Sequence, residues 1–200
     1  MTNSQWLFEL ELKGKAVTLV PLKKEHAPAL VAAAADGELW NLWFTSVPGK
    51  SSIIAYIEHA LAEQAAGRAL AFAVVDNSSG KIIGSTRFCN ADSNNKRVEI
   101  GYTWYAKSFQ KTIVNTECKH LLLRHAFEEL SAIAVEFRTH WHNRASRNAI
   151  ARLGAKQDGV LRNHQKLADG SYRDTVVFSI INSEWLTVKA NLLFKLQVHG

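Results

Sequence analysis

The chain has 200 residues, of which 47% are hydrophobic and 21% charged, and its formal net charge is +6. This composition excludes a disordered or fibrous chain and predicts one domain over residues 1–200, with a core at about 10–185 and a tail at about 186–200. No apolar run approaches the ~18 residues that span a bilayer, so no membrane-spanning helix is expected. Residues 1–9 lack a signal-peptide pattern, so a cytoplasmic protein is expected.

The N-terminal third predicts an extended segment and two helices. Phe8–Leu22 reads as extended on both sides of a Lys-Gly-Lys turn, and Lys24–Ala35 has apolar residues at the 0, 3, 4, 7 spacing of a helix. A second helix is expected to begin at Ser51 or Ser52 and to end before Gly67.

The middle of the chain predicts three strands. Ala69–Asp76 is a continuous apolar run, which is typical of a strand buried on both faces of a sheet. Lys81–Cys89 is its hairpin partner. Arg97–Tyr105 is rich in aromatic and β-branched residues and predicts the third strand.

A helix and another strand follow. The helix is expected over about Asn115–Leu130, with Asn115 or Thr116 as its cap and Glu117 in its first turn, and Ala134–His140 is the strand. Such a crossover joins parallel strands. The helix N-terminus then lies at the carboxyl end of the preceding strand, where its backbone amides and dipole favour an anion.

The last quarter predicts a short helix and a hairpin. Asn143 caps the helix and Gly154 ends it. Gly159–Lys166 and Tyr172–Ile181 pair as the hairpin, and Ser183–Leu196 is compatible with a further helix.

The positive charge is concentrated between residues 138 and 173, where eight bases outweigh two acids by the whole excess of the chain. The bases are Arg138, Arg144, Arg147, Arg152, Lys156, Arg162, Lys166 and Arg173. Such a region favours an anionic ligand, either nucleic acid or a polyphosphate cofactor, unless it is only a solvated basic face.

Three local motifs occur in a fixed order, at Val98–Trp104, Phe109–Glu117 and Asn143–Gly154. Together with Asp169–Thr175 and the order of the elements, they resemble the GNAT superfamily of N-acetyltransferases, in its RimJ/RimL-like branch of ribosomal-protein-alanine N-acetyltransferases. The similarity covers roughly residues 10–185.

The resemblance implies a mixed α/β (α+β) fold with a splayed seven-stranded sheet, helices on both faces and the order β-α-α-β-β-β-α-β-α-β-β. It also implies acetyl-CoA as the acetyl-donor cosubstrate. Pantetheine would lie in the opening of the sheet, and the pyrophosphate on the loop before the long helix. The implied cofactor-binding residues are Tyr102, Thr103, Trp104, Gln110, Lys111, Thr112, Ile113, Val114, Asn115, Thr116 and Asn143.

The loop departs from the family pattern, because Ile113 and Asn115 stand where the family has small residues, usually glycines. Glycine lets backbone amides close on a phosphate, and isoleucine tolerates a positive φ badly. Fewer amides are therefore expected to bind, with the Lys111 or Thr112 side chain compensating. For Asn143 a helix-capping role is the alternative to a bond with pantetheine.

Acetyl transfer needs a base for the ammonium proton and a donor for the departing thiolate. Glu99 is the candidate base, or else a structural carboxylate. Ser146 is the candidate donor, because the resembled branch has serine there, or else it caps the backbone. Trp40, Trp43 and Phe44 would cover the acceptor site, or else belong to the core.

The expected function is transfer to a primary amine, either a protein N-terminus or a small molecule, and two other functions are alternatives. The missing glycines motivate an inactive acyl-CoA-binding or regulatory module. The basic region motivates nucleic-acid binding, but no nucleic-acid-binding motif supports it. His140 and His142 share a strand face without a third ligand, so no metal is expected. Cys89 and Cys118 are predicted to be reduced thiols, and a homodimer is left open.

Overall fold

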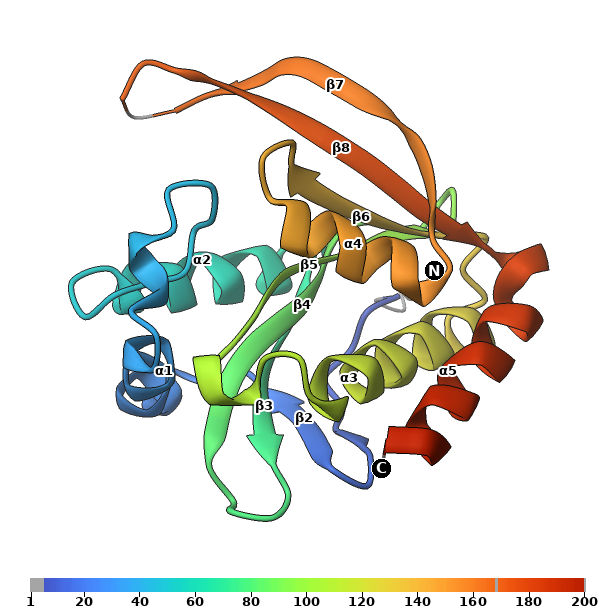
Figure 1. Ribbon diagram of the computed structural model, residues 1–200, viewed down its shortest axis with the longest axis horizontal. Coiled ribbons are helices and arrows are strands. Elements are labelled where there is room, and N and C mark those ends of the chain that lie inside the picture. Colours follow the sequence, from blue (N-terminus) through green and yellow to red (C-terminus); the bar gives the residue numbers. More distant parts are fainter. Residues whose placement is uncertain (1–5, 168, 200) are drawn as a thin grey trace.

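The structure is a computed structural model that describes residues 6–167 and 169–199, so residues 1–5, 168 and 200 of the predicted domain lie outside it. It contains one eight-stranded sheet in the order β1-β2-β3-β4-β5-β6-β8-β7 (Figure 1). The strands are β1 (Leu12–Lys13), β2 (Val17–Pro21), β3 (Leu70–Asp76), β4 (Ile82–Asp92), β5 (Arg97–Tyr105), β6 (Ala134–His140), β7 (Lys156–Lys166) and β8 (Tyr172–Ile181). The α-helices are α1 (Ala27–Ala35), α2 (Ile53–Ala65), α3 (Ile113–Arg124), α4 (Arg144–Leu153) and α5 (Trp185–His199).

The predicted order of elements is confirmed, and the mixed α/β fold with it. The strand number is corrected from seven to eight, because the N-terminal extended segment forms two paired strands, β1 and β2. The turn between them is closed by a backbone hydrogen bond from Gly14 to Val17. The C-terminal tail is helical and forms α5.

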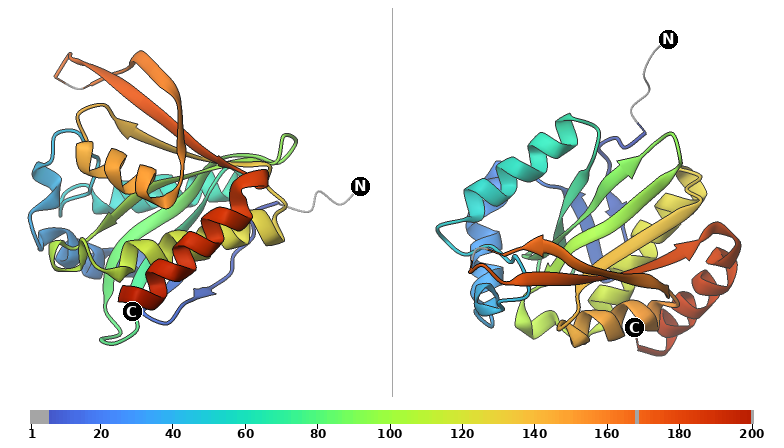
Figure 2. Two further views of the ribbon diagram at one scale, coloured as in Figure 1. Left: turned by 45° about the vertical axis from the view of Figure 1, so that its right-hand side comes forward. Right: turned by 90° about the horizontal axis from the view of Figure 1, so that it is seen from above.

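Helices cover both faces of the sheet and create two hydrophobic cores (Figures 1 and 2). On one face, α3 and α5 lie side by side, and residues of α4 join the same core. On the other face, α1 and α2 pack over small side chains such as Ala71 and Ala73 of β3. Strand β3 is therefore buried on both sides, as its continuous apolar sequence predicts.

Strands β5 and β6 are joined for only part of their length. They are parallel and pair at three positions, Arg97 with Ala134, Val98 with Val135 and Glu99 with Glu136, although β5 has nine residues and β6 seven. Beyond Glu99 the two strands diverge, so the remainder of β5 faces a split in the sheet rather than a neighbouring strand.

Candidate functional site

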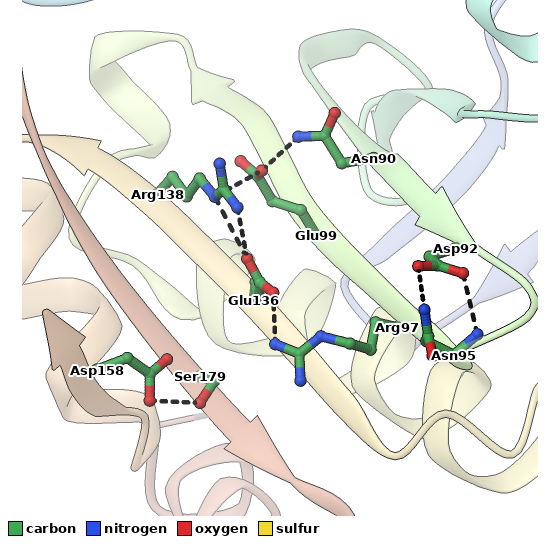
Figure 3. A network of polar contacts seen from close by, with 9 residues as sticks. All are labelled: Asn90, Asp92, Asn95, Arg97, Glu99, Glu136, Arg138, Asp158 and Ser179. Atoms are coloured by element: carbon green, nitrogen blue, oxygen red, sulfur yellow. Dashed lines mark hydrogen bonds and ion pairs between the residues drawn. The ribbon is translucent and has the colours of Figure 1, made fainter. Parts of the chain in front are cut away.

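Glu99 lies at the point where the split begins. Its side chain is buried, with the residue 8% exposed. The carboxylate accepts a 2.7 Å hydrogen bond from Asn90 Nδ2 and lies 3.5 Å from Arg138 Nε. Figure 3 shows this carboxylate above that of Glu136, with Arg138 reaching both.

The environment of Glu99 favours a proton acceptor. Burial raises the pKa of the Glu99 carboxyl above its ordinary value, while the hydrogen bond from Asn90 and the charge of Arg138 act in the opposite direction. A carboxylate with a raised pKa binds a proton more readily, which is the property that a general base needs.

A β-bulge distorts β5 within the split. The pairing with β4 shifts between Ser85 opposite Trp104 and Arg87 opposite Gly101, so β5 carries an extra residue there. Tyr102 occupies the bulge with a φ of 51°, a conformation that non-glycine residues adopt rarely. A bulge re-aims the local peptide groups, and this one lies in the half of β5 that is not paired with β6.

The three residues predicted to bind pantetheine lie on this open half of β5 and differ in exposure. Tyr102 is 43% exposed and its ring covers the guanidinium of Arg87, with 3.9 Å between Cζ and the ring centroid. Trp104 is buried and its Nε1 donates to Tyr56 Oη at 3.4 Å. The Thr103 hydroxyl shares a 2.7 Å hydrogen bond with that of Thr86.

The helix after β5 begins earlier than predicted. Thr112, rather than Asn115 or Thr116, is the cap of α3, because its extended backbone lets the hydroxyl accept from Val114 N at 3.3 Å. In the loop between β5 and α3 it is Lys111 that has a positive φ, of 62°. Ile113 is already the first residue of the helix. Ile113 therefore does not have to adopt the positive φ that isoleucine tolerates badly.

The early start of α3 changes the setting of the predicted loop. Gln110 precedes the helix, where its Nε2 donates to Tyr105 O at 3.0 Å. Val114 and Thr116 are buried residues of α3, and Asn115 between them is half-buried. The loop before α3 therefore ends at Thr112, and the N-terminus of α3 follows it directly.

Asn143 caps α4, as predicted, since its Oδ1 accepts from Ser146 N at 3.0 Å. Among the described residues, the Ser146 hydroxyl has no hydrogen-bond partner, so only its backbone takes part in the cap. Gly154 ends the helix with a φ of 107°, also as predicted. Ser146 itself is half-buried.

The predicted acceptor-site aromatics belong to the segment between α1 and α2. Trp43 is 62% exposed, which excludes a core role, and its ring lies 5.0 Å from that of His140 and 5.7 Å from that of His142. Phe44 is half-buried and packs edge-on against Trp43 at 5.6 Å. Trp40 is also exposed. Trp43 thus connects this segment to the end of β6.

The end of β6 also borders a surface pocket shared with the β7–β8 hairpin. The pocket is lined by His140, Trp141, His142, Arg162, Asn163, Tyr172 and Asp174. No group of three or more potential metal-ligating side chains occurs in the described ranges. Part of the basic region is neutralised locally, for example by ion pairs of Arg162 with Asp174 and of Lys156 with Glu184.

Two buried cations near the split were not predicted. Arg87 is 1% exposed and lies under Tyr102. Lys119 is 5% exposed, and its Nζ donates to Thr103 Oγ1 at 2.6 Å. The sequence carries no signal for either one, because a single basic residue in a strand or helix normally indicates a solvent-facing position.

Comparison with known proteins agrees with this geometry. The Acetyltransferase (GNAT) domain family matches residues 16–156. A Bacillus subtilis (strain 168) protein provisionally named ribosomal N-acetyltransferase YdaF is 34% identical over 107 residues, which are 53% of this chain and 57% of that protein. The match therefore spans little more than half the length of this relative.

Solved structures extend the likeness to nearly the whole chain. A structure provisionally described as an acetyltransferase from T. thermophilus has a TM-score of 0.83 at 33% identity, covering 96% of this chain and 99% of that one. Mycobacterium smegmatis RimJ, in complex with CoA-disulfide, has a TM-score of 0.76 at 21% identity, covering 90% and 88%.

Among the described helices, none has the length and apolar composition needed to cross a membrane.

The family match, the splayed sheet and the motifs around the split lead to one assignment. The chain belongs to the GNAT acetyltransferase family.

Proposed function

We propose that this protein transfers an acetyl group from acetyl-CoA to a primary amine by direct attack in a ternary complex. The observation that carries the proposal is the split between β5 and β6, with the buried carboxylate of Glu99 at its beginning. One strand edge in the split is free to bind an extended ligand by backbone hydrogen bonds, as a neighbouring strand would.

The free edge of β5 and the N-terminus of α3 together suit pantetheine and pyrophosphate. Tyr102, Thr103 and Trp104 lie in the half of β5 that is not paired with β6. The N-terminus of α3, with Thr112 as its cap, follows from the same end of β5, and its dipole favours an anion. The RimJ structure with CoA-disulfide supports the same ligand class here.

Glu99 and Ser146 are assigned the chemical roles. Glu99 takes the proton of the attacking ammonium, directly or through a water. The Ser146 hydroxyl, at the start of α4, donates a hydrogen bond to the departing sulfur. Asn143 orients this turn through its cap. No metal is required, because the amine is already a nucleophile once it has lost its proton.

The proposed acceptor is the N-terminal amine of a protein. The name of the YdaF relative and the relation to RimJ support this class, and small-molecule amines are the alternative. Trp43, with Trp40 and Phe44, would bound the acceptor side, because it extends over the end of β6. The cytoplasmic location and a homodimer stay predictions.

The first test is thermal unfolding with and without acetyl-CoA. A ligand at about a hundred times its Kd stabilises the folded state by roughly 2.7 kcal/mol, which corresponds to a rise in Tm of roughly 5–10 °C at this chain length. Thiol release would then be followed with peptide N-termini and small amines. No rise in Tm at saturating acetyl-CoA would refute the proposal, and turnover only with small amines would exclude the N-terminal acceptor.

A further inference from the structure

Lys119 carries a buried positive charge that none of the roles above uses. The residue is 5% exposed, and its Nζ donates to the Thr103 hydroxyl at 2.6 Å. No carboxylate in the described part of the chain forms an ion pair with it, and the titratable groups that act on its pKa are the thiols of Cys118 and Cys89. Buried ammonium groups are ordinarily paired with an acid, so this charge is uncompensated.

The ammonium of Lys119 lies at the split. Lys119 belongs to α3, the helix that connects β5 to β6 and packs against the sheet beside them. Thr103 is in the unpaired half of β5 and is also bonded to Thr86. The ring centroid of Phe137, the first residue of β6 beyond the pairing, is 5.9 Å from Lys119 Nζ. The amine therefore lies on the α3 side of the sheet, near side chains of both diverging strands.

Glu99 and Lys119 flank the split from opposite faces of the sheet. Side chains alternate along a strand, and Val98 and Ile100 pack into the core that contains α3. Glu99 consequently points to the other face, where a Cβ added to Gly101 would lie 3.0 Å from its carboxylate oxygen. The candidate base and the buried cation thus lie on opposite faces of the sheet at the split.

We propose that Lys119 stabilises the CoA thiolate as it leaves, an inference that rests on the proposed function. The acceptor ammonium first loses one proton through Glu99 to solvent. During transfer the neutral amine nitrogen bonds to the acetyl carbon, and its second proton passes to Glu99. The carbon–sulfur bond breaks and the sulfur keeps the electron pair, so that CoA leaves as a thiolate and is protonated by solvent. A cation fixed in a buried place stabilises such developing charge more than water-exposed groups do.

The protonation state of Lys119 is compatible with this role. Burial lowers the pKa of the Lys119 ammonium to about 8, so the group remains largely charged at neutral pH. The Ser146 hydroxyl can add a hydrogen bond to the sulfur, but it supplies no charge. The two residues therefore have separable effects.

The test is the pKa of the CoA thiol in the complex, followed by the ultraviolet absorbance of the thiolate as pH is raised. In the wild-type complex we expect this pKa to lie roughly one to three pH units below that of free CoA. In Lys119→Met it should return to the free value or above, and Lys119→Arg should restore most of the difference. Lys189→Met, a lysine of α5 paired with Glu128, is the matched control and should behave as the wild type.

Binding of CoA by calorimetry, together with circular dichroism, is measured on the same variants. An unchanged thiol pKa in folded, CoA-binding Lys119→Met would overturn the inference, and so would a wild-type complex whose thiol pKa equals that of free CoA. If Lys119→Met does not fold, two other titrations decide. One is the thiol titration of the wild type, and the other is that of Thr103→Val, a variant that releases the ammonium from its hydrogen bond. Failure of the wild type to bind CoA would instead refute the proposed function.

Discussion

Glu99 and Glu136 stand opposite each other at the last paired position of β5 and β6, and their surroundings shift their pKa values in opposite directions. Burial raises the pKa of Glu99. Burial acts likewise on Glu136, but hydrogen bonds from Arg97 and Arg138 outweigh it and leave the pKa of Glu136 below its ordinary value. Two carboxylates whose pKa values are shifted apart in this way are suited to separate roles. Glu136 forms ion pairs with Arg97 and Arg138. The raised pKa of Glu99 suits it to accept a proton.

Replacing Glu99 with glutamine should lower kcat by roughly 10²–10⁴-fold, because the amide keeps the shape but accepts no proton. Acetyl-CoA affinity should change little. The measurement is steady-state thiol release together with calorimetric binding. A variant with wild-type kcat would remove Glu99 from the mechanism.

The pH profile provides an independent check on Glu99. A base works only when ionised, so kcat of the wild type should fall as pH drops through the raised pKa of Glu99. This fall should begin at a higher pH than for an ordinary carboxyl group. The corresponding limb should be absent from the residual activity of Glu99→Gln.

Ser146→Ala should lower kcat by ~10²-fold while leaving the fold unchanged. The cap of α4 uses the backbone of Ser146, which alanine retains. Thermal unfolding should therefore give a wild-type Tm. Asn148→Ala, at an exposed position of the same helix, is the control for a general effect on α4. Full activity in Ser146→Ala would leave the serine with no part in the chemistry.

Trp43→Ala should raise KM for the acceptor about tenfold, equivalent to about 1.4 kcal/mol, without changing KM for acetyl-CoA. The reason is that its ring packs on His140 and His142 beside the proposed acceptor side. Trp40→Ala is the comparison, because no contact between its ring and those histidines is found in the described structure. Equal rises in both KM values for Trp43→Ala would indicate a structural role instead.

Glu117→Ala should lower the free energy of unfolding by roughly 2–4 kcal/mol. The Glu117 carboxylate accepts hydrogen bonds from the backbone N–H groups of Lys15, Ala16 and Val17 at 2.7–2.8 Å. Removing it leaves three donors of the β1–β2 turn without partners. Urea unfolding measures the loss, with Glu129→Ala, an exposed position at the end of the same helical segment, as the control. A loss no larger than that of the control would contradict this role.

The role of Glu117 shows one limit of the sequence. An acidic residue near a helix start predicts a favourable interaction with the helix dipole, and this is how it reads locally. In the structure Glu117 is buried and binds a turn about 100 positions away in the chain. A contact of that separation leaves no local pattern, although the nearby Gly14 is consistent with it, since a Cβ there would lie 2.6 Å from Glu117 Cδ.

The order of strands and helices was predictable because each element has its own periodicity. Ala69–Asp76 and the Asn143 cap are examples that depend only on neighbouring residues. The burial of Lys119 was not predictable. Helix α3 is covered by the sheet on one side and by α5 on the other, so almost all of its residues are buried. An amphipathic pattern assumes one solvent-exposed face, and this helix has almost none.

The most direct test of the account is hydrogen–deuterium exchange of the backbone with and without acetyl-CoA. If the split binds the cofactor, acetyl-CoA should slow exchange in two peptides. One contains Tyr102–Trp104 and the other contains the α3 N-terminus at Thr112–Val114, while the peptides of β1 and β2 should not change. Slowed exchange confined to the pocket at the end of β6 and the β7–β8 hairpin, with no change at those two segments, would contradict the account.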